Sequence, residues 1–164
     1  MERLSTLFFQ VDDQLTGFMR SYGIRFLRVS LGVIFFWFGF LKFFPGLSPA
    51  DQIATTTIST LTFGVIQPSV SIIVLAAWET LIGLGLFTGK YLRITLFLLF
   101  TQMVGTMTPL ILFPTETFTR FPYAPTLEGQ YIIKNLVLIS AGLVVGATVR
   151  GGRIIETEPV GNDS

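Results

Sequence analysis

The stretch IRFLRVSLGVIFFWFGFLKFF, residues 24–44, decides the fold of this 164-residue chain. Its length matches the ~20 apolar residues that a helix needs to cross the hydrocarbon core of a bilayer. Three further apolar runs of similar length follow, at residues 70–89, 92–113 and 129–149. We therefore predict an all-α integral membrane protein, in which residues 23–150 form a four-helix transmembrane bundle within the lipid bilayer.

The composition supports this prediction and excludes several kinds of chemistry. Hydrophobic residues make up 51% of the chain and charged residues 13%, whereas a typical soluble domain has roughly 25% charged residues. Cysteine and histidine are both absent, which excludes thiolate catalysis, histidine bases and Cys- or His-ligated metal centres. We predict no metal site, no covalently bound cofactor and no catalytic residue, and the net charge of +1 does not indicate nucleic-acid binding.

Lysine and arginine are distributed unevenly between the two sides of the predicted bundle. Most lie in the N-terminal flank, the turn between spans two and three, and the C-terminal tail: Arg3, Arg20, Arg25, Arg28, Lys90, Arg93, Arg150 and Arg153. The other side carries Lys42, Arg120 and Lys134. Because cytoplasmic loops carry an excess of Lys and Arg, both termini are predicted to be cytoplasmic.

Residues 1–22 have the pattern of an amphipathic helix. Their apolar residues recur at steps of three and four: Leu4, Leu7, Phe8, Val11, Leu15, Phe18, Met19 and Tyr22. Such a helix lies along the cytoplasmic membrane interface, or packs its apolar face on a partner subunit. At the other terminus, the polar residues 151–164 are predicted to be a disordered cytoplasmic tail.

The two connections on the outer side also carry structural signals. Ser48 as N-cap, Pro49 in the first helical position and Asp51 in the first turn indicate a helix start. We predict a short outer-side helix that ends near Leu61, before breaks at Gly64 and Pro68. The connection at 114–128 contains three prolines and is predicted to be an ordered, non-helical cap.

Few ionisable groups lie within the spans, and each needs a partner because a charge near mid-membrane costs at least ~2.5 kcal/mol. Glu79 falls halfway along the second span, and Lys42 and Lys134 enter from the outer side. Gln102 and small residues form a polar stripe on the third span, where helices can approach closely. We predict an outward-facing pocket lined by polar side chains, namely Lys42, Glu79, Gln102, Lys134 and Asn135.

Two interpretations of this cluster stay open. Intramembrane ionisable residues are by default candidates for a functional site, and two lysines against one glutamate favour an anionic or carbonyl-bearing ligand. Alternatively, Glu79 with Lys42 or Lys134 is a buried ion pair that only specifies helix packing.

Four short motifs together resemble DoxX-like membrane proteins, most closely the YkgB-type branch. They are FLRVSLGVIFFWFGFLKFFPG at 26–46, W-E-x-x-I-G-x-x-L-x-x-G at 78–89, T-P-L at 108–110, and F-P-Y followed by I-I-K-N at 121–135. The resemblance implies a four-helix membrane bundle in a bacterial inner (plasma) membrane. DoxX-like members are associated with oxidoreductase complexes, including quinone-linked ones, and the related NACHO proteins act as membrane assembly chaperones.

Three functions follow as hypotheses. The first is a non-catalytic or accessory subunit that binds a lipid-soluble or anionic molecule, with quinone as the leading candidate, and needs a membrane oxidoreductase as partner because it has no redox group. The second is an assembly or chaperone subunit without a ligand. The third is a small transporter or a proton pathway through Glu79. Homo-oligomerisation is compatible with all three.

Overall fold

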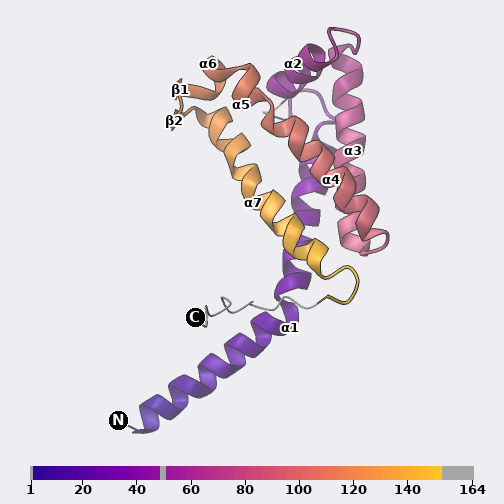
Figure 1. The fold of residues 1–164 in the computed structure, drawn as a ribbon. Helices are drawn as coiled ribbons and strands as arrows, with labels where there is room; N and C mark the ends of the chain where they lie inside the picture. The colour runs from indigo at the N-terminus through magenta and orange to yellow at the C-terminus, as the bar shows by residue number, and fades with distance from the viewer. Residues whose placement is uncertain (1, 49–50, 153–164) are drawn as a thin grey trace, which may run out of the picture.

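The computed structural model describes residues 2–48 and 51–152 and contains four long helices (Figure 1). These are α1 (Glu2–Leu41), α3 (Pro68–Thr88), α4 (Leu92–Met107) and α7 (Leu127–Ala147). Four segments are long and apolar enough to cross a membrane: Phe9–Leu41, Pro68–Thr88, Leu92–Leu112 and Leu127–Ala147. The predicted all-α bundle with four spans is thereby confirmed. Pro49 and residues 153–164 of the predicted tail lie outside the described residues.

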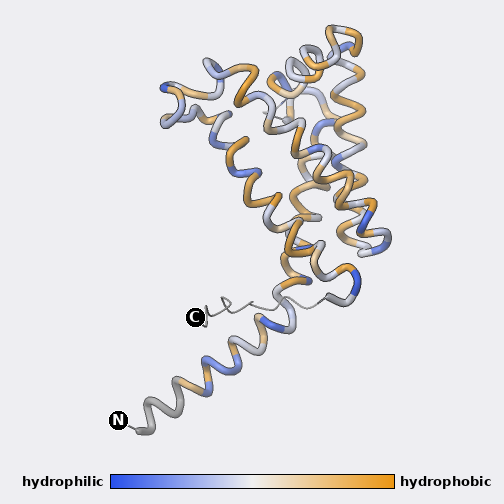
Figure 2. Tube along the Cα trace, viewed as in Figure 1, coloured by the Kyte–Doolittle hydropathy of each residue, from blue (hydrophilic) through white to orange (hydrophobic). Residues whose placement is uncertain are grey.

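Helix α1 joins the predicted N-terminal amphipathic segment and the first predicted span in one helix. It runs unbroken over 40 residues, because the sequence places no proline before Pro45. At 1.5 Å per residue the helix is about 60 Å long, twice the thickness of the hydrocarbon core. Its N-terminal part projects away from the bundle (Figure 1), and residues 9–23 are exposed. Blue, hydrophilic residues recur along this projecting part, whereas orange dominates the bundle (Figure 2).

The antiparallel contact between α1 and α3 depends on small residues. A Cβ atom at Gly39 would lie 2.7 Å from Glu79 Cβ, and one at Gly83 would lie 2.6 Å from Phe36 Cβ. Glycine at these positions therefore lets the two backbones approach closely, as is common between membrane helices. Around this contact the four long helices enclose an apolar core of Leu31, Phe35, Ile82, Leu86, Leu96, Leu99, Met103, Ala141 and Val145.

Short elements gather at one end of the bundle, which we call the cap end. They are α2 (Asp51–Leu61), α5 (Pro109–Leu112), α6 (Pro114–Thr117) and the antiparallel strands β1 (Phe118–Arg120) and β2 (Ala124–Pro125). The opposite end, with the α3–α4 turn and the C-terminal end of α7, is the turn end (Figure 1).

The cap end agrees with the predictions for the first connection and corrects the one for the second. Helix α2 ends at Leu61, and Gly64 follows it with φ 77°. The segment 114–128 was predicted to be non-helical, but α6 makes a helical turn there, since proline favours the first position of a helix. Thr126 caps α7 by accepting a hydrogen bond from the Gly129 amide at 3.2 Å.

Candidate functional site

A buried ion pair joins the end of α1 to the middle of α3. The Lys42 Nζ atom lies 2.6 Å from Glu79 Oε2, and the two side chains are only 7% and 11% exposed. Lys42 also donates a hydrogen bond to the Phe38 carbonyl oxygen at 3.3 Å. Among the described residues this is the one salt bridge.

Gln102 on α4 completes the contact with the Glu79 carboxylate. Its Nε2 donates to Glu79 Oε1 at 2.7 Å, so that each carboxylate oxygen accepts a bond from a different helix or helix end. The orientation of the Gln102 amide follows from this contact, because an ionised carboxylate only accepts hydrogen bonds. The structure therefore brings together three of the predicted residues, from three separate segments.

The end of α1 places this contact deep in the bundle. Gly39 packs against Glu79, near the middle of α3, and α1 stops two residues later at Leu41. About 15 Å of α3 continues beyond that level toward the cap end, at 1.5 Å per residue. Non-helical backbone at membrane depth is tolerated where it is buried in protein or lines a cavity, and interrupted helices often form binding sites in membrane proteins.

Two buried oxygen atoms near the ion pair lack a hydrogen-bond partner within the described part of the chain. They are Gln102 Oε1 and Asp51 Oδ1. Asp51, at the start of α2, lies close enough to Glu79 for the two carboxylates to interact electrostatically. Buried polar atoms without a partner are rare in native proteins and suggest a missing ligand, water or ion. We call Lys42, Asp51, Glu79 and Gln102 the polar cluster.

Lys134 and Asn135 are not part of the polar cluster, although the predicted pocket included both. Lys134 is exposed on α7, and its Nζ lies 5.2 Å from the centre of the Tyr131 ring, while Asn135 is half-buried. No hydrogen bond or ion pair between Lys134 and Glu79 occurs within residues 2–48 and 51–152.

Asp51 is the member of the polar cluster that sequence reasoning missed as a site residue. In the sequence it has the signature of a first-turn acidic residue, which is favourable there because of the helix dipole. The sequence also held a signal for a role in the site, because Asp51 is the single charged residue between Lys42 and Glu79.

The cluster has no arrangement typical of a metal centre or of nucleophilic catalysis. Within the described ranges there is no group of three or more His, Cys, Asp or Glu residues that could hold a metal ion. Its chemistry is that of hydrogen bonding in a low-dielectric environment, where an unpaired donor or acceptor is costly.

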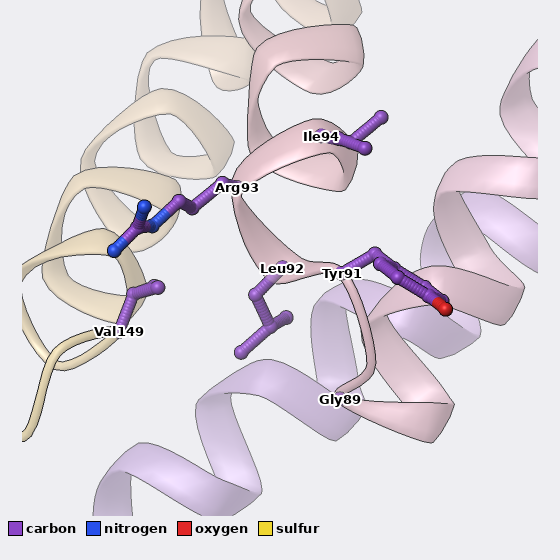
Figure 3. Close-up of a pocket in the computed structure, with 6 residues that line it drawn as sticks. All are labelled: Gly89, Tyr91, Leu92, Arg93, Ile94 and Val149. Carbon is purple, nitrogen blue, oxygen red and sulfur yellow. The ribbon is translucent and has the colours of Figure 1, made fainter.

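Two cavities lie at the turn end, away from the polar cluster. One, of about 360 Å³, is lined by Gly89, Tyr91, Leu92, Arg93, Ile94 and Val149 (Figure 3). The other, of about 430 Å³, is lined by Arg93, Leu96, Phe97, Phe100, Gly146, Val149 and Arg150.

Comparison with known protein families gives a match over the first three spans. Residues 23–113, more than half of the chain, match the family model described as DoxX. The matched range contains all four residues of the polar cluster and ends before α7. Neither a curated protein nor a solved structure matches the chain. The closer resemblance to the YkgB-type branch stays a prediction.

Proposed function

The chain belongs to the DoxX family, and on that premise we propose that it is a non-catalytic, accessory membrane protein that binds the polar head of a lipid-soluble molecule at the polar cluster. The observation that carries the proposal is the buried Gln102 Oε1 without a partner, beside the ion pair. A ligand hydroxyl or amide group would supply the missing donor, and leaving such an atom unpaired costs about 1–3 kcal/mol.

The charges of the cluster favour an uncharged ligand. The Lys42 ammonium group is paired with Glu79, and Lys134 is not part of the cluster. The cluster therefore holds no unpaired cation for the anionic ligand that the sequence also allowed. An uncharged head group with both hydrogen-bond acceptors and donors matches the available atoms better.

A quinol fits this set of donors and acceptors, whereas the oxidised quinone can use only the Lys42 donor. Lys42 has three N–H donors, and two of them are directed to Glu79 and to the Phe38 carbonyl oxygen. The third can donate to a quinone carbonyl oxygen, whereas the hydroxyl of a quinol can donate to Gln102 Oε1. When bound, such a molecule supplies two-electron redox chemistry. Since the chain itself has no redox group, we propose a membrane oxidoreductase as the partner.

The test is to extract and quantify the quinone that co-purifies with the protein from its native membranes. Gln102→Leu removes the oxygen that would accept a hydrogen bond from a quinol hydroxyl, and is expected to lower the bound quinol, extracted under reducing conditions, at least tenfold. Gln130→Leu, at an exposed position on α7, is the matched control and should leave the amount unchanged. Wild-type protein without quinone, or equal amounts in both variants, would refute the proposal.

A second candidate function, assembly of a partner membrane protein, is favoured by the projecting part of α1. Large apolar side chains there are exposed, namely Val11, Leu15, Phe18, Met19 and Tyr22. They offer an apolar stripe to the membrane interface or to a partner helix. Asp12→Lys together with Asp13→Lys should abolish co-purification of a partner, while Gln102→Leu should leave it intact. The opposite pattern would exclude this role.

We also propose that the protein lies in a bacterial inner membrane with both termini in the cytoplasm, and that it belongs to the YkgB-type branch. The uneven distribution of Lys and Arg supports this orientation, with Lys90, Arg93 and Arg150 at the turn end. Because the chain has no cysteine, a cysteine introduced at one position is the only thiol of the protein that can be labelled. Tyr123→Cys in the cap should react with an impermeant maleimide added outside intact cells, and Lys90→Cys should not. Labelling of Lys90→Cys but not of Tyr123→Cys would show that the topology is the opposite of the one proposed.

A further inference from the structure

The two cavities at the turn end adjoin each other along the seam between α4 and α7. Both are lined by Arg93 and Val149. Figure 3 shows the Arg93 side chain extending from α4 toward Val149 and the C-terminal end of α7. The two cavities therefore form one groove with a guanidinium group at its mouth.

The mouth of the groove is positively charged. Arg93 and Arg150 both line it and are exposed, and neither forms a salt bridge within the described part of the chain. The acidic side chains described lie elsewhere, on the projecting part of α1, in the polar cluster and at the cap end: Asp12, Asp13, Asp51, Glu79, Glu116 and Glu128. No carboxylate among these competes for the two arginines.

The interior of the groove is apolar. Leu96, Phe97 and Phe100 follow Arg93 at three, four and seven positions, which places them on one face of α4. This face extends about 10 Å from the arginine toward the middle of the bundle at 1.5 Å per residue. On the facing side the groove is lined by Gly146 of α7, which has no side chain of its own.

Tyr91 marks the depth of the groove mouth. It lines the first cavity and is 80% exposed. Tyrosine is enriched at membrane–water interfaces, where its ring lies at the level of the lipid head groups. The arginines are thus at head-group level and the apolar face of α4 is at acyl-chain level.

We propose that this groove binds one phospholipid with an anionic head group. Its phosphate lies between Arg93 and Arg150, because guanidinium groups form bidentate hydrogen bonds with phosphate. One acyl chain lies over Phe97, Phe100 and Gly146. A basic pocket between transmembrane helices at one membrane face has the chemistry of such a lipid site. A second copy of the chain is a poorer occupant, since a two-fold contact would bring the same arginines together. The inference does not depend on the polar cluster, which lies toward the opposite end.

The experiment is native mass spectrometry of the full-length protein in neutral detergent, titrated with phosphatidylglycerol or phosphatidylcholine of identical acyl chains. We expect one phosphatidylglycerol to bind and to be retained at least tenfold better than phosphatidylcholine. Each basic residue near a membrane surface contributes about 1 kcal/mol, so Arg93→Gln with Arg150→Gln should weaken binding by about 30-fold. Lys134→Gln, which removes an exposed charge on α7 outside the groove, should bind like the wild type.

A second variant tests the groove independently of the charges. A Cβ at Gly146 would lie 3.4 Å from the Leu96 side chain, and the further carbons of Gly146→Leu should fill the groove and expel the acyl chain, with wild-type helicity as the check that the variant folds. Binding of the double arginine variant or of Gly146→Leu at the wild-type level would overturn the proposal. If inorganic phosphate protected the protein from unfolding as well as phosphatidylglycerol does, the proposal would also be overturned, because the acyl chain would then contribute nothing. A dimer that Gly146→Leu converts to a monomer would assign the groove to a second copy instead.

Discussion

Replacing Lys42 by methionine tests whether the ion pair is a buried, coupled unit. Methionine preserves most of the side-chain length but removes the ammonium group that lies 2.6 Å from Glu79 Oε2. Glu79 then keeps a single side-chain hydrogen bond, from Gln102 at 2.7 Å. The charge would be almost completely removed from water, because the Glu79 side chain is 11% exposed.

The expected loss of stability is large. Removing one partner of a buried ion pair typically costs about 3–5 kcal/mol, whereas replacing both partners is often neutral. Lys42→Met should therefore lower the free energy of unfolding by about 3 kcal/mol or more. Glu79→Gln keeps an acceptor for Gln102 but leaves the ammonium group unpaired, and should be similarly costly. The double variant should recover most of this loss and give a coupling energy of at least about 2 kcal/mol.

The measurement is reversible unfolding in mixed micelles of a mild detergent and SDS, followed by the fluorescence of Trp37 and Trp78. Lys134→Met is the matched control, because Lys134 is exposed and lies outside the polar cluster. It should change the free energy of unfolding by less than about 0.5 kcal/mol. If Lys42→Met costs as little as the control, or if the two single losses simply add, the description of a buried, coupled pair is wrong.

Three further variants test the packing of the bundle by the same unfolding measurement. Gly39→Val should cost at least about 1–3 kcal/mol, because its Cβ would lie 2.7 Å from Glu79 Cβ; a loss no larger than that of an exposed control would contradict the close α1–α3 contact. Trp78→Phe removes the bond from its Nε1 to the Leu98 carbonyl oxygen at 3.1 Å and should cost about 1 kcal/mol, with unchanged stability arguing against that bond. Thr126→Ala removes the N-cap of α7 and should cost about 0.5–2 kcal/mol, whereas Thr126→Ser should be nearly neutral.

The small-residue contact between α1 and α3 shows how far a helical pattern can predict packing. The sequence predicted close helix approach at small residues, and the structure shows such approaches at Gly39 and Gly83. Helices in a membrane associate without a strong hydrophobic force between them, so close contacts form preferentially at small residues. The boundary expected near residue 22 falls inside α1, which is one helix over Glu2–Leu41.

The membrane character, the four spans and the candidacy of Glu79 and Lys42 followed from the sequence alone. A chain segment that crosses hydrocarbon as a helix must be long and apolar. Any charged residue within such a segment is costly and is therefore easy to identify in the sequence. Which charges meet was decided by the tertiary structure: α1 ends beside the middle of α3, Asp51 approaches Glu79 from α2, and Lys134 lies exposed on α7. The rotation of each helix about its axis and its depth relative to its neighbours result from packing between helices. A linear pattern does not contain that information, so the membership of the cluster became evident only in three dimensions.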